Sequence, residues 1–229
     1  MPTRDAPLGL PLFLLNLKTY RSALGRNGLK IGAQLARLGR KAGVAVALAP
    51  ATPDLAWLAR ELPIPVLAQH VDPAPAGPGT GFVPVESALA SGARGSLVNH
   101  SEDPVARSVV GRLVALLGSH RMTAVVCAGT VEEARRLAAF RPPYLAIEPP
   151  ELIGGDVAVS SARPELISKS VAAVRRVAPR TQVLCGAGIH GREDVAKSLE
   201  LGSRGILVAS AVTKAADPTA AIRELLRGF

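Results

Sequence analysis

Residues 182–210 read QVLCGAGIHGREDVAKSLELGSRGILVAS and contain the unit from which the fold of this chain can be worked out. Two short apolar runs, Gln182–Cys185 and Gly205–Val208, flank a helical pattern, Glu193–Leu201, that ends at Gly202. Neither run alternates apolar with polar residues, as a strand with one solvated face would. The unit therefore predicts two parallel strands that are covered on both faces and are joined by a helix.

The same unit recurs along the chain, and most apolar runs are followed by turn residues and then by a helix-like stretch. Thr130 and Glu133 form a capping-box sequence before one predicted helix, and prolines mark the first turn of several others. The predicted strands are Phe13–Leu17, Val44–Ala49, Val66–Gln69, Gly95–Asn99, Ala124–Cys127, Tyr144–Ile147, Gln182–Cys185 and Gly205–Val208. The predicted helices are Gly28–Lys41, Asp54–Leu62, the short and weak Pro84–Ser91, the stretch from Asp103-Pro104 to Gly118, Ala134–Ala139, Glu165–Val177, Glu193–Leu201 and the stretch from Asp217-Pro218 to about Gly228.

Eight strand–helix units in 229 residues leave room for little except a closed α/β barrel. No linker or shift in composition interrupts them. We therefore expect one domain over residues 1–229, with the (β/α)8 barrel itself at roughly residues 12–228. An open, doubly wound parallel sheet is the alternative that the pattern leaves open.

The composition favours a globular protein of a reducing compartment. Hydrophobic residues make up 48% of the chain, enough to bury a large core, and no apolar run reaches the ~18 residues that suggest a membrane span. The only two cysteines, Cys127 and Cys185, lie in predicted strands and lack the Cys or His companions of a metal site. We expect two buried free thiols, no metal, and a soluble cytoplasmic protein without a signal peptide.

The formal net charge of +9 is compatible with nucleic acid, an anionic membrane or a small anionic substrate as partner. The charge is spread as single Arg residues along the helix patterns, and only 3% of the residues are aromatic, too few for a binder of single strands. We expect neither nucleic acid nor a membrane as partner. Most of the charge then forms a solvated face, and part of it steers a phosphorylated substrate.

In a closed barrel the residues that follow the strands share one rim, where such folds place their chemistry. Taken singly, the candidates have plain interpretations: a solvated lysine, a capping or core histidine, a glutamate that caps a turn, or ordinary turn glycines. The rim would hold Asn16 and Lys18 after the first predicted strand, His100 after the fourth, Glu148 after the sixth, Gly186 to Gly188 after the seventh and Ala209-Ser210 after the eighth.

Together these residues suit proton abstraction beside a carbonyl group. A carboxylate at an apolar site that excludes water is a stronger base. An imidazole and an ammonium opposite it can stabilise a developing enediolate oxygen. The turns of small residues expose backbone N–H groups, a usual phosphate cradle. The residues thus predict the enolisation of a phosphorylated sugar.

Six segments match motifs of one known family, in order along the chain from about Leu12 to Phe229. They are Asn16-Leu-Lys18-Thr-Tyr20, Ala68-Gln-His-Val-Asp72, Asn99-His-Ser-Glu102, Glu148-Pro-Pro-Glu-Leu-Ile-Gly154, Cys185-Gly-Ala-Gly-Ile189 and Val208-Ala-Ser210. With them the chain resembles the triosephosphate isomerase family in its compact archaeal form. The resemblance implies a TIM barrel that interconverts dihydroxyacetone phosphate and D-glyceraldehyde 3-phosphate through an enediolate, in glycolysis and gluconeogenesis, without a cofactor.

The resemblance also implies a role for each residue. Glu148 would be the base that moves the proton between two carbons, and His100 the neutral electrophile that polarises the carbonyl. Lys18 would offset the negative charge of the substrate, and Asn16 would help to orient it. Ser101 and Glu102 would hold Lys18 and the substrate side of the site. Backbone N–H groups would bind the phosphate near Ile153, Gly154, Gly186, Gly188, Ala209 and Ser210.

An oligomer is a further implication of the resemblance. In the family, a glycine-flanked threonine after the third strand reaches across a subunit interface to the residues that Asn16 and His100 match, and Thr80 occupies that place here. A homodimer and a homotetramer both fit.

In the family, a lid begins after the residue that Glu148 matches. Asp156 stands where that lid usually has glycine, so we expect closure of the lid to be slightly less favourable here.

Two other interpretations remain. Another phosphate-binding barrel, such as an isomerase or lyase of aromatic amino-acid biosynthesis, would carry a different set of residues at the rim. A non-catalytic binder of anions or nucleic acid would use the +9 charge and would bind DNA with a steep salt dependence.

Overall fold

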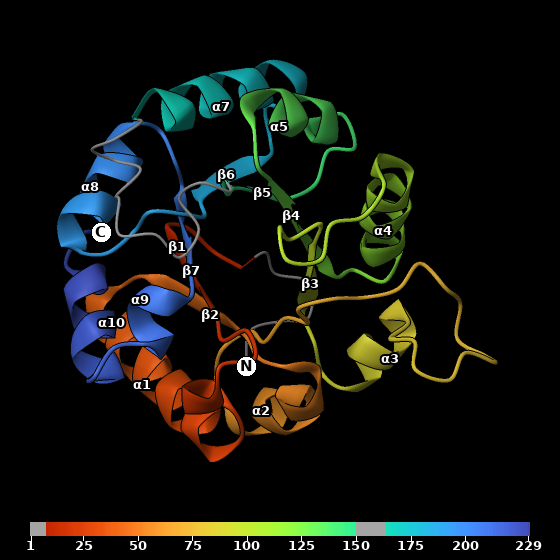
Figure 1. Cartoon of the computed structure of the whole chain (residues 1–229), viewed down its shortest axis with the longest axis horizontal. Coiled ribbons are helices and arrows are strands. Elements are labelled where there is room, and N and C mark those ends of the chain that lie inside the picture. The colour runs from red at the N-terminus through yellow and green to blue at the C-terminus, as the bar shows by residue number, and fades with distance from the viewer. Residues whose placement is uncertain (1–7, 150–163) are drawn as a thin grey trace.

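The computed structural model describes residues 8–149 and 164–229, with parallel strands in an inner ring and helices around it (Figure 1). The strands are β1 (Leu12–Asn16), β2 (Ala45–Ala49), β3 (Gly95–Val98), β4 (Thr123–Ala128), β5 (Tyr144–Ile147), β6 (Gln182–Cys185) and β7 (Gly205–Val208). The helices are α1 (Arg26–Ala42), α2 (Leu55–Glu61), α3 (Val85–Ala90), α4 (Arg107–Ser119), α5 (Val131–Ala138), α7 (Pro164–Val177), α8 (Arg192–Glu200), α9 (Ser210–Thr213) and α10 (Pro218–Leu226), with 3-10 turns at Arg21–Ala23 and Thr52–Asp54.

Two isolated bridges close the ring of strands. The sheet runs in the order β2-β1-β7-β6-β5-β4-β3, and the segment 66–69 lies between its two ends. Val66 is bridged in parallel to Leu48 of β2, and Ala68 to Ser96 of β3. The strand predicted here is reduced to these bridges, because Pro65 before it has no N–H to donate to a ladder. The predicted fold class, a (β/α)8 TIM barrel, is confirmed, and the ring excludes the open sheet.

Each strand is buried on both faces, against two different apolar layers. In β1, Phe13 and Leu15 belong to the layer between strands and helices, whereas Leu12 and Leu14 belong to a cluster that consists almost entirely of strand residues and fills the barrel. Burial of apolar surface contributes ~25 cal/mol per Å² and is the main stabilising term. The middle of the strands is therefore mostly apolar, although β3 contains the buried Ser96, whose hydroxyl is donated to the Leu97 carbonyl at 2.7 Å. The barrel cluster also contains Ala47, Leu67, Leu97, Val125, Cys127, Tyr144, Ala146, Leu184 and Leu207.

Side-chain caps start two of the helices where the sequence predicts them. Thr130 Oγ1 accepts the N–H of Glu133 at 3.1 Å before α5. Asp217 Oδ1 accepts two N–H groups at the start of α10, at 2.8 and 3.1 Å, next to the first-turn proline. Each such cap stabilises by ~1 kcal/mol.

Helix α4 begins later than predicted. The sequence placed its start at Asp103-Pro104, whereas the helix runs from Arg107. Asn99 Oδ1 accepts the N–H of Val105 at 3.0 Å, and the Asp103 carboxylate lies 2.6 Å from His70 Nδ1. These long-range contacts hold the residues before α4 in a loop, since they occupy the groups that would have formed its first turn.

A long loop, residues 72–83, leaves the barrel between the bridged segment and α3; we call it the arm (Figure 1). Its two ends are joined at Asp72, which donates its N–H to the Val83 carbonyl at 2.9 Å and accepts the N–H of Val83 on Oδ2 at 2.6 Å. Thr80 is exposed, and Phe82 is 57% exposed. The arm therefore carries apolar surface away from the barrel.

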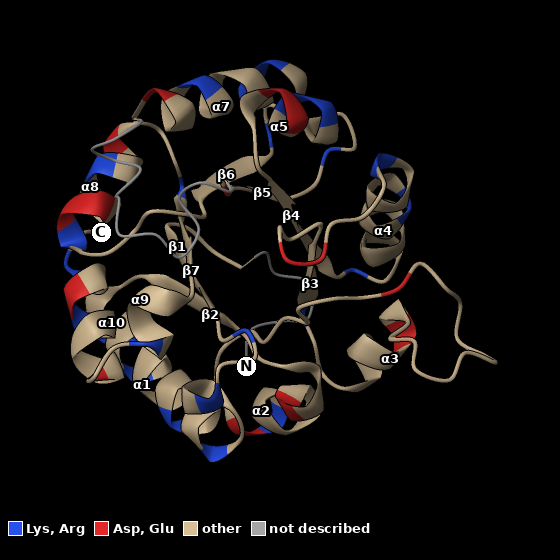
Figure 2. Cartoon of the chain, viewed as in Figure 1, with Lys and Arg blue, Asp and Glu red and all other residues tan. Residues whose placement is uncertain are grey.

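Charged residues lie mostly on the helices and loops outside the ring of strands, with Lys and Arg interspersed among Asp and Glu (Figure 2). This distribution agrees with the prediction that most of the charge lies on a solvated face. Within residues 8–149 and 164–229, no helix is long and apolar enough to cross a bilayer.

We predict that Gly205→Ala strongly destabilises the barrel. Gly205 has φ +149°, and a Cβ there would overlap the carbonyl oxygen of Leu12 in the neighbouring strand β1. The strain and the overlap should together cost about 3 kcal/mol or more of unfolding free energy. The matched control is Gly118→Ala, because a Cβ at this helical position meets nothing within 4 Å. The urea midpoint of unfolding should fall strongly for Gly205→Ala and not for Gly118→Ala. Equal midpoints for the two variants would contradict the prediction.

Candidate active site

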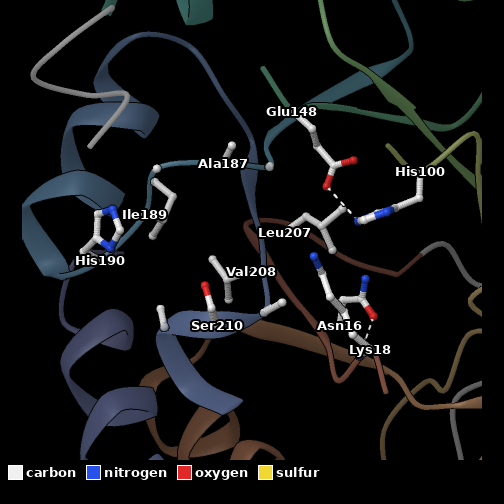
Figure 3. A pocket seen from close by; sticks show the side chains of 14 residues that line it. Asn16, Lys18, His100, Glu148, Ala187, Ile189, His190, Leu207, Val208 and Ser210 are labelled. Carbon is white, nitrogen blue, oxygen red and sulfur yellow. Dashed lines mark hydrogen bonds and ion pairs between the residues drawn. The ribbon is translucent and has the colours of Figure 1, made fainter. Parts of the chain in front are cut away.

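One pocket at the carboxyl end of the barrel collects the predicted polar side chains (Figure 3). The pocket is partly open to solvent. Glu148 and His100 face each other on one side, above Asn16 and Lys18, and the residues after β6 and β7 lie opposite (Figure 3). The opposite wall consists of Gly186, Ala187, Gly188, Ile189, His190, Leu207, Val208, Ala209, Ser210 and Ala211.

Glu148 stands directly after β5 and points into the barrel. It continues the interior face of Tyr144 and Ala146, and its N–H is donated to the Ala128 carbonyl at 2.8 Å. Only 3% of the residue is exposed, and Oε1 lies 3.4 Å from His100 Nε2. Oε2 is buried and has no hydrogen-bond partner among residues 8–149 and 164–229. Buried polar atoms are normally paired, so this oxygen marks Glu148 as a candidate for chemistry with a ligand.

Gly186 makes room for this carboxylate. A Cβ at position 186 would lie 2.5 Å from Glu148 Cγ and 3.0 Å from the Ile147 carbonyl oxygen. The N–H of Gly186 is donated to that same carbonyl at 2.8 Å. The sheet therefore already uses this N–H, and the assignment of Gly186 to the phosphate site stays a prediction. Gly186 also allows the close approach of Glu148.

The ring of His100 is held in one orientation by the turn that follows it. Asn99 has φ +60°, and His100, 7% exposed, lines the pocket. The Glu102 N–H is donated to His100 Nδ1 at 3.1 Å. A ring nitrogen that accepts a hydrogen bond carries no proton, so the ring proton lies on Nε2, on the side of Glu148.

Asn99 and Glu133 support this turn, and the sequence analysis missed the pair. Asn99 Nδ2 donates to the Cys127 carbonyl at 3.0 Å and to Glu133 Oε1 at 3.1 Å. Glu133 Oε2 accepts the N–H of Gly129 at 2.8 Å. The sequence places Glu133 only in a capping box. Its backbone N–H does join the cap, but its carboxylate faces Asn99. No local signal predicts this bond, because the two residues are far apart in the sequence.

Lys18 adopts a backbone conformation that is uncommon outside glycine, with φ +47°. Its N–H is donated to Asn16 Oδ1 at 2.9 Å, and its ammonium lies 2.8 Å from Glu102 Oε1. Glu102 thus contacts Lys18, the contact that the resemblance implies. Ser101 is exposed and forms no hydrogen bond within the described ranges, so the structure gives it no contact with Lys18.

Gln69 connects the residues after β1, although the sequence analysis gave it no role. Its Nε2 lies 3.1 Å from Asn16 Oδ1, 3.1 Å from the Lys18 carbonyl and 3.0 Å from the Ala49 carbonyl. One amide therefore orients Asn16 and holds the strained Lys18 turn. Its place in the Ala68-to-Asp72 motif was the only signal that could have identified it.

The wall opposite Glu148 presents backbone N–H groups. Gly188 and Ser210 line the pocket, and within the described part of the chain no acceptor takes the N–H of either. His190 also lines this wall, although the sequence analysis did not single it out. Its backbone N–H is donated to Asp194 Oδ2 at 2.9 Å. Ile153, Gly154 and Asp156 lie outside the described residues.

Both cysteines are buried and free, as predicted. Burial raises the pKa of the Cys185 thiol to about 12. Burial, followed by the neighbouring Glu148 carboxylate, also raises the pKa of Cys127 well above its ordinary value. Among the described residues, no group of three His, Cys, Asp or Glu side chains could hold a metal ion.

Comparison with known proteins identifies the relatives of this chain. The family model for triosephosphate isomerase matches residues 11–225. A triosephosphate isomerase of Cenarchaeum symbiosum is 47% identical over 96% of this chain and 98% of its own length. Those of Methanothermus fervidus and Methanosarcina barkeri are 43% and 40% identical, over 94% and 96% of this chain and 97% and 99% of their own lengths.

We predict that the folded protein does not react with a thiol reagent such as DTNB at pH 8, since both thiols are buried and protonated. Both should react in denaturant. Folding raises the pKa of Cys185 from 9.0 to about 12, so its contribution to stability is complete below pH 9 and is lost as the pH rises towards 12. Cys185→Ala should weaken this alkaline decline in urea midpoints. Rapid labelling of the folded chain would contradict the prediction.

Proposed function

Because this chain belongs to the triosephosphate isomerase family, it interconverts dihydroxyacetone phosphate and D-glyceraldehyde 3-phosphate, and we propose that Glu148, His100 and Lys18 carry out this reaction. The reaction is a step of glycolysis and gluconeogenesis. Family membership removes the two other interpretations that the sequence left open, a different phosphate-binding barrel and a non-catalytic binder.

The base in this proposal is Glu148. It takes a proton from the hydroxyl-bearing carbon of dihydroxyacetone phosphate as an enediolate forms, and it returns a proton to the neighbouring carbon. The observation that carries the assignment is the buried Oε2 with no partner among the described residues, in a pocket wall beside His100. A positioned base contributes roughly 10²–10⁴-fold to the rate.

His100 is the electrophile. With Nδ1 occupied by the Glu102 N–H, its proton on Nε2 can be donated to the substrate oxygen on which negative charge develops. The same nitrogen lies near Glu148, so one substrate can contact both groups, carbon to carboxylate and oxygen to imidazole. A carboxylate base with a neutral imidazole is the pairing for which this family is known.

Lys18 supplies positive charge to the substrate side of the pocket. The Lys18 side chain is only 13% exposed, so the field of its ammonium is less screened than that of a surface lysine. Asn16, whose amide oxygen accepts from Gln69 and from the Lys18 N–H, orients the substrate beside it.

The phosphate is bound, in this proposal, by backbone N–H groups of Gly188, Ala209 and Ser210 on the wall opposite Glu148. Support comes from the unpaired N–H groups there and from the small size of these residues. Ile153 and Gly154, and the effect of Asp156 on lid closure, stay predictions of the resemblance.

We further propose that the active unit is a homo-oligomer of the cytoplasm. The arm projects from the barrel with Thr80 and Phe82 exposed, and insertion of the arm into a second copy would bury that surface (Figure 1). Thr80 would then approach Asn16 and His100 of that copy. A dimer and a tetramer both meet this requirement.

Glu148→Gln should leave a folded protein whose kcat is lower by about 10³-fold, because an amide cannot accept the substrate proton. A coupled assay of triose phosphate interconversion gives kcat, and urea unfolding checks the fold. Glu200→Gln, at an exposed position of α8, is the matched control and should keep full activity. Retention of a tenth of the wild-type kcat by Glu148→Gln would disprove the base assignment.

Replacement of Gly79-Thr80-Gly81 with three charged residues should produce folded monomers with little activity. Charged residues at the tip of the arm could enter a partner subunit only by losing their hydration, which is costly. Sedimentation reports the assembly, and the urea midpoint of the monomer reports the subunit fold. An intact, fully active oligomer would rule out the role of Thr80 between subunits.

A further inference from the structure

His70 lies between two carboxylates that belong to different loops. It follows the bridged segment 66–69 at the carboxyl rim of the barrel, and its side chain is 36% exposed. Nδ1 is 2.6 Å from Asp103 Oδ2, and Nε2 is 3.2 Å from Asp72 Oδ1. Each ring nitrogen therefore faces a different acid. This histidine does not line the active-site pocket among the described residues, and nothing in the mechanism above uses it.

One of these acids, Asp72, forms the base of the arm. Its backbone N–H and its Oδ2 are both bonded to Val83, at the other end of the arm. Its Oδ1 is the oxygen that faces His70. The carboxylate is thus anchored on one oxygen and offers His70 a well-defined acceptor on the other.

The other acid, Asp103, ends the turn that carries His100. Its N–H is donated to the His100 carbonyl at 2.8 Å, and the Glu102 N–H inside the turn is donated to His100 Nδ1. The turn itself is exposed from Ser101 to Pro104, so little apolar contact holds it. Among the described residues, the contact with His70 is the only one that ties the Asp103 side chain to another part of the chain.

We propose that His70 is a positioning residue, which fastens the His100 turn to the base of the arm and so sets the orientation of the His100 ring. A proton on Nδ1 is sufficient for the bond to Asp103, and the doubly protonated ring also gives Asp72 a donor. The distance of 2.6 Å to Asp103 is short, and hydrogen bonds to a charged group are shorter than neutral ones. The inference rests on the proposed role of His100 as electrophile.

The expected effect is on turnover and not on stability. An ion pair this exposed adds little to the folding free energy. A displacement of about 1 Å at a catalytic group, in contrast, can cost on the order of 10²-fold in rate. Loss of the Asp103 contact should therefore lower kcat about tenfold, while KM and the unfolding midpoint change little.

Two amide replacements separate the two contacts. In His70→Asn the amide nitrogen lies near the place of Nδ1 and keeps a donor for Asp103. In His70→Gln it lies near the place of Nε2 and keeps a donor for Asp72 only. We expect His70→Gln to lose about tenfold in kcat and His70→Asn to stay within about threefold of the wild type. His120→Gln, a half-buried histidine with a loose contact of 3.7 Å to Glu86, is the matched control and should be unchanged.

Asp103→Ala provides a second, independent variant for the test. It should reproduce the loss of His70→Gln, and the double variant should be no worse than either single variant, since both remove the same bond. Sedimentation of every variant shows whether the assembly is unchanged. The proposal is overturned if His70→Gln stays within twofold of the wild-type kcat, if Asn is no better than Gln, or if the two losses add.

The His100→Gln background distinguishes this proposal from the one on which it rests. There, His70→Gln should cause no further loss if it acts through His100, and a further tenfold loss would overturn the inference. If His100→Gln alone keeps wild-type activity, the proposed electrophile is wrong. If it loses about 10²-fold while His70→Gln is fully active, only the positioning role of His70 is wrong.

Discussion

Burial of both faces of every strand is the constraint on which the rest of this molecule depends. Alternate residues of each strand face either the helices or the barrel interior, and both sides are mostly apolar, so a polar group there needs a local partner, as Ser96 in β3 finds in the Leu97 carbonyl. Most polar side chains therefore lie at the strand ends. Because all strands are parallel, their carboxyl ends share one rim, and Asn16 and Glu148 enter the pocket there simply by continuing the interior faces of β1 and β5.

The backbone carbonyl groups at this rim need hydrogen-bond donors. Two side chains supply them: the Gln69 amide bonds two carbonyls near β1 and β2, and the Asn99 amide bonds the Cys127 carbonyl in β4. Their bonds hold Lys18 and Asn99 in positive-φ conformations, which cost free energy on their own. Within the pocket, Glu148 Oε2 is a buried oxygen that has no hydrogen-bond partner among residues 8–149 and 164–229.

The arm and the His100 turn depend on contacts with each other. Both begin at the rim, and both are largely exposed. Their acids, Asp72 and Asp103, meet on the two nitrogens of His70. If the arm reaches a second subunit, as we propose, the same histidine connects the subunit interface to the electrophile. Chemistry and assembly would then share one small set of side chains.

The barrel class, most of the strands, and the position of Lys18, His100 and Glu148 at one rim could be predicted from the sequence alone. These predictions use local information: apolar runs, capping residues, and short motifs at strand ends. The late start of α4, the closure of the ring by bridges, and the contacts of Gly186, Gln69, Glu133 and His70 became visible only in the folded structure. The partners of Gln69, Glu133 and His70 lie 53, 34 and 33 residues away, and only the closed barrel brings them within hydrogen-bond distance. Gly186 is needed because two neighbouring strands place Glu148 against it, a steric fact that no stretch of sequence contains.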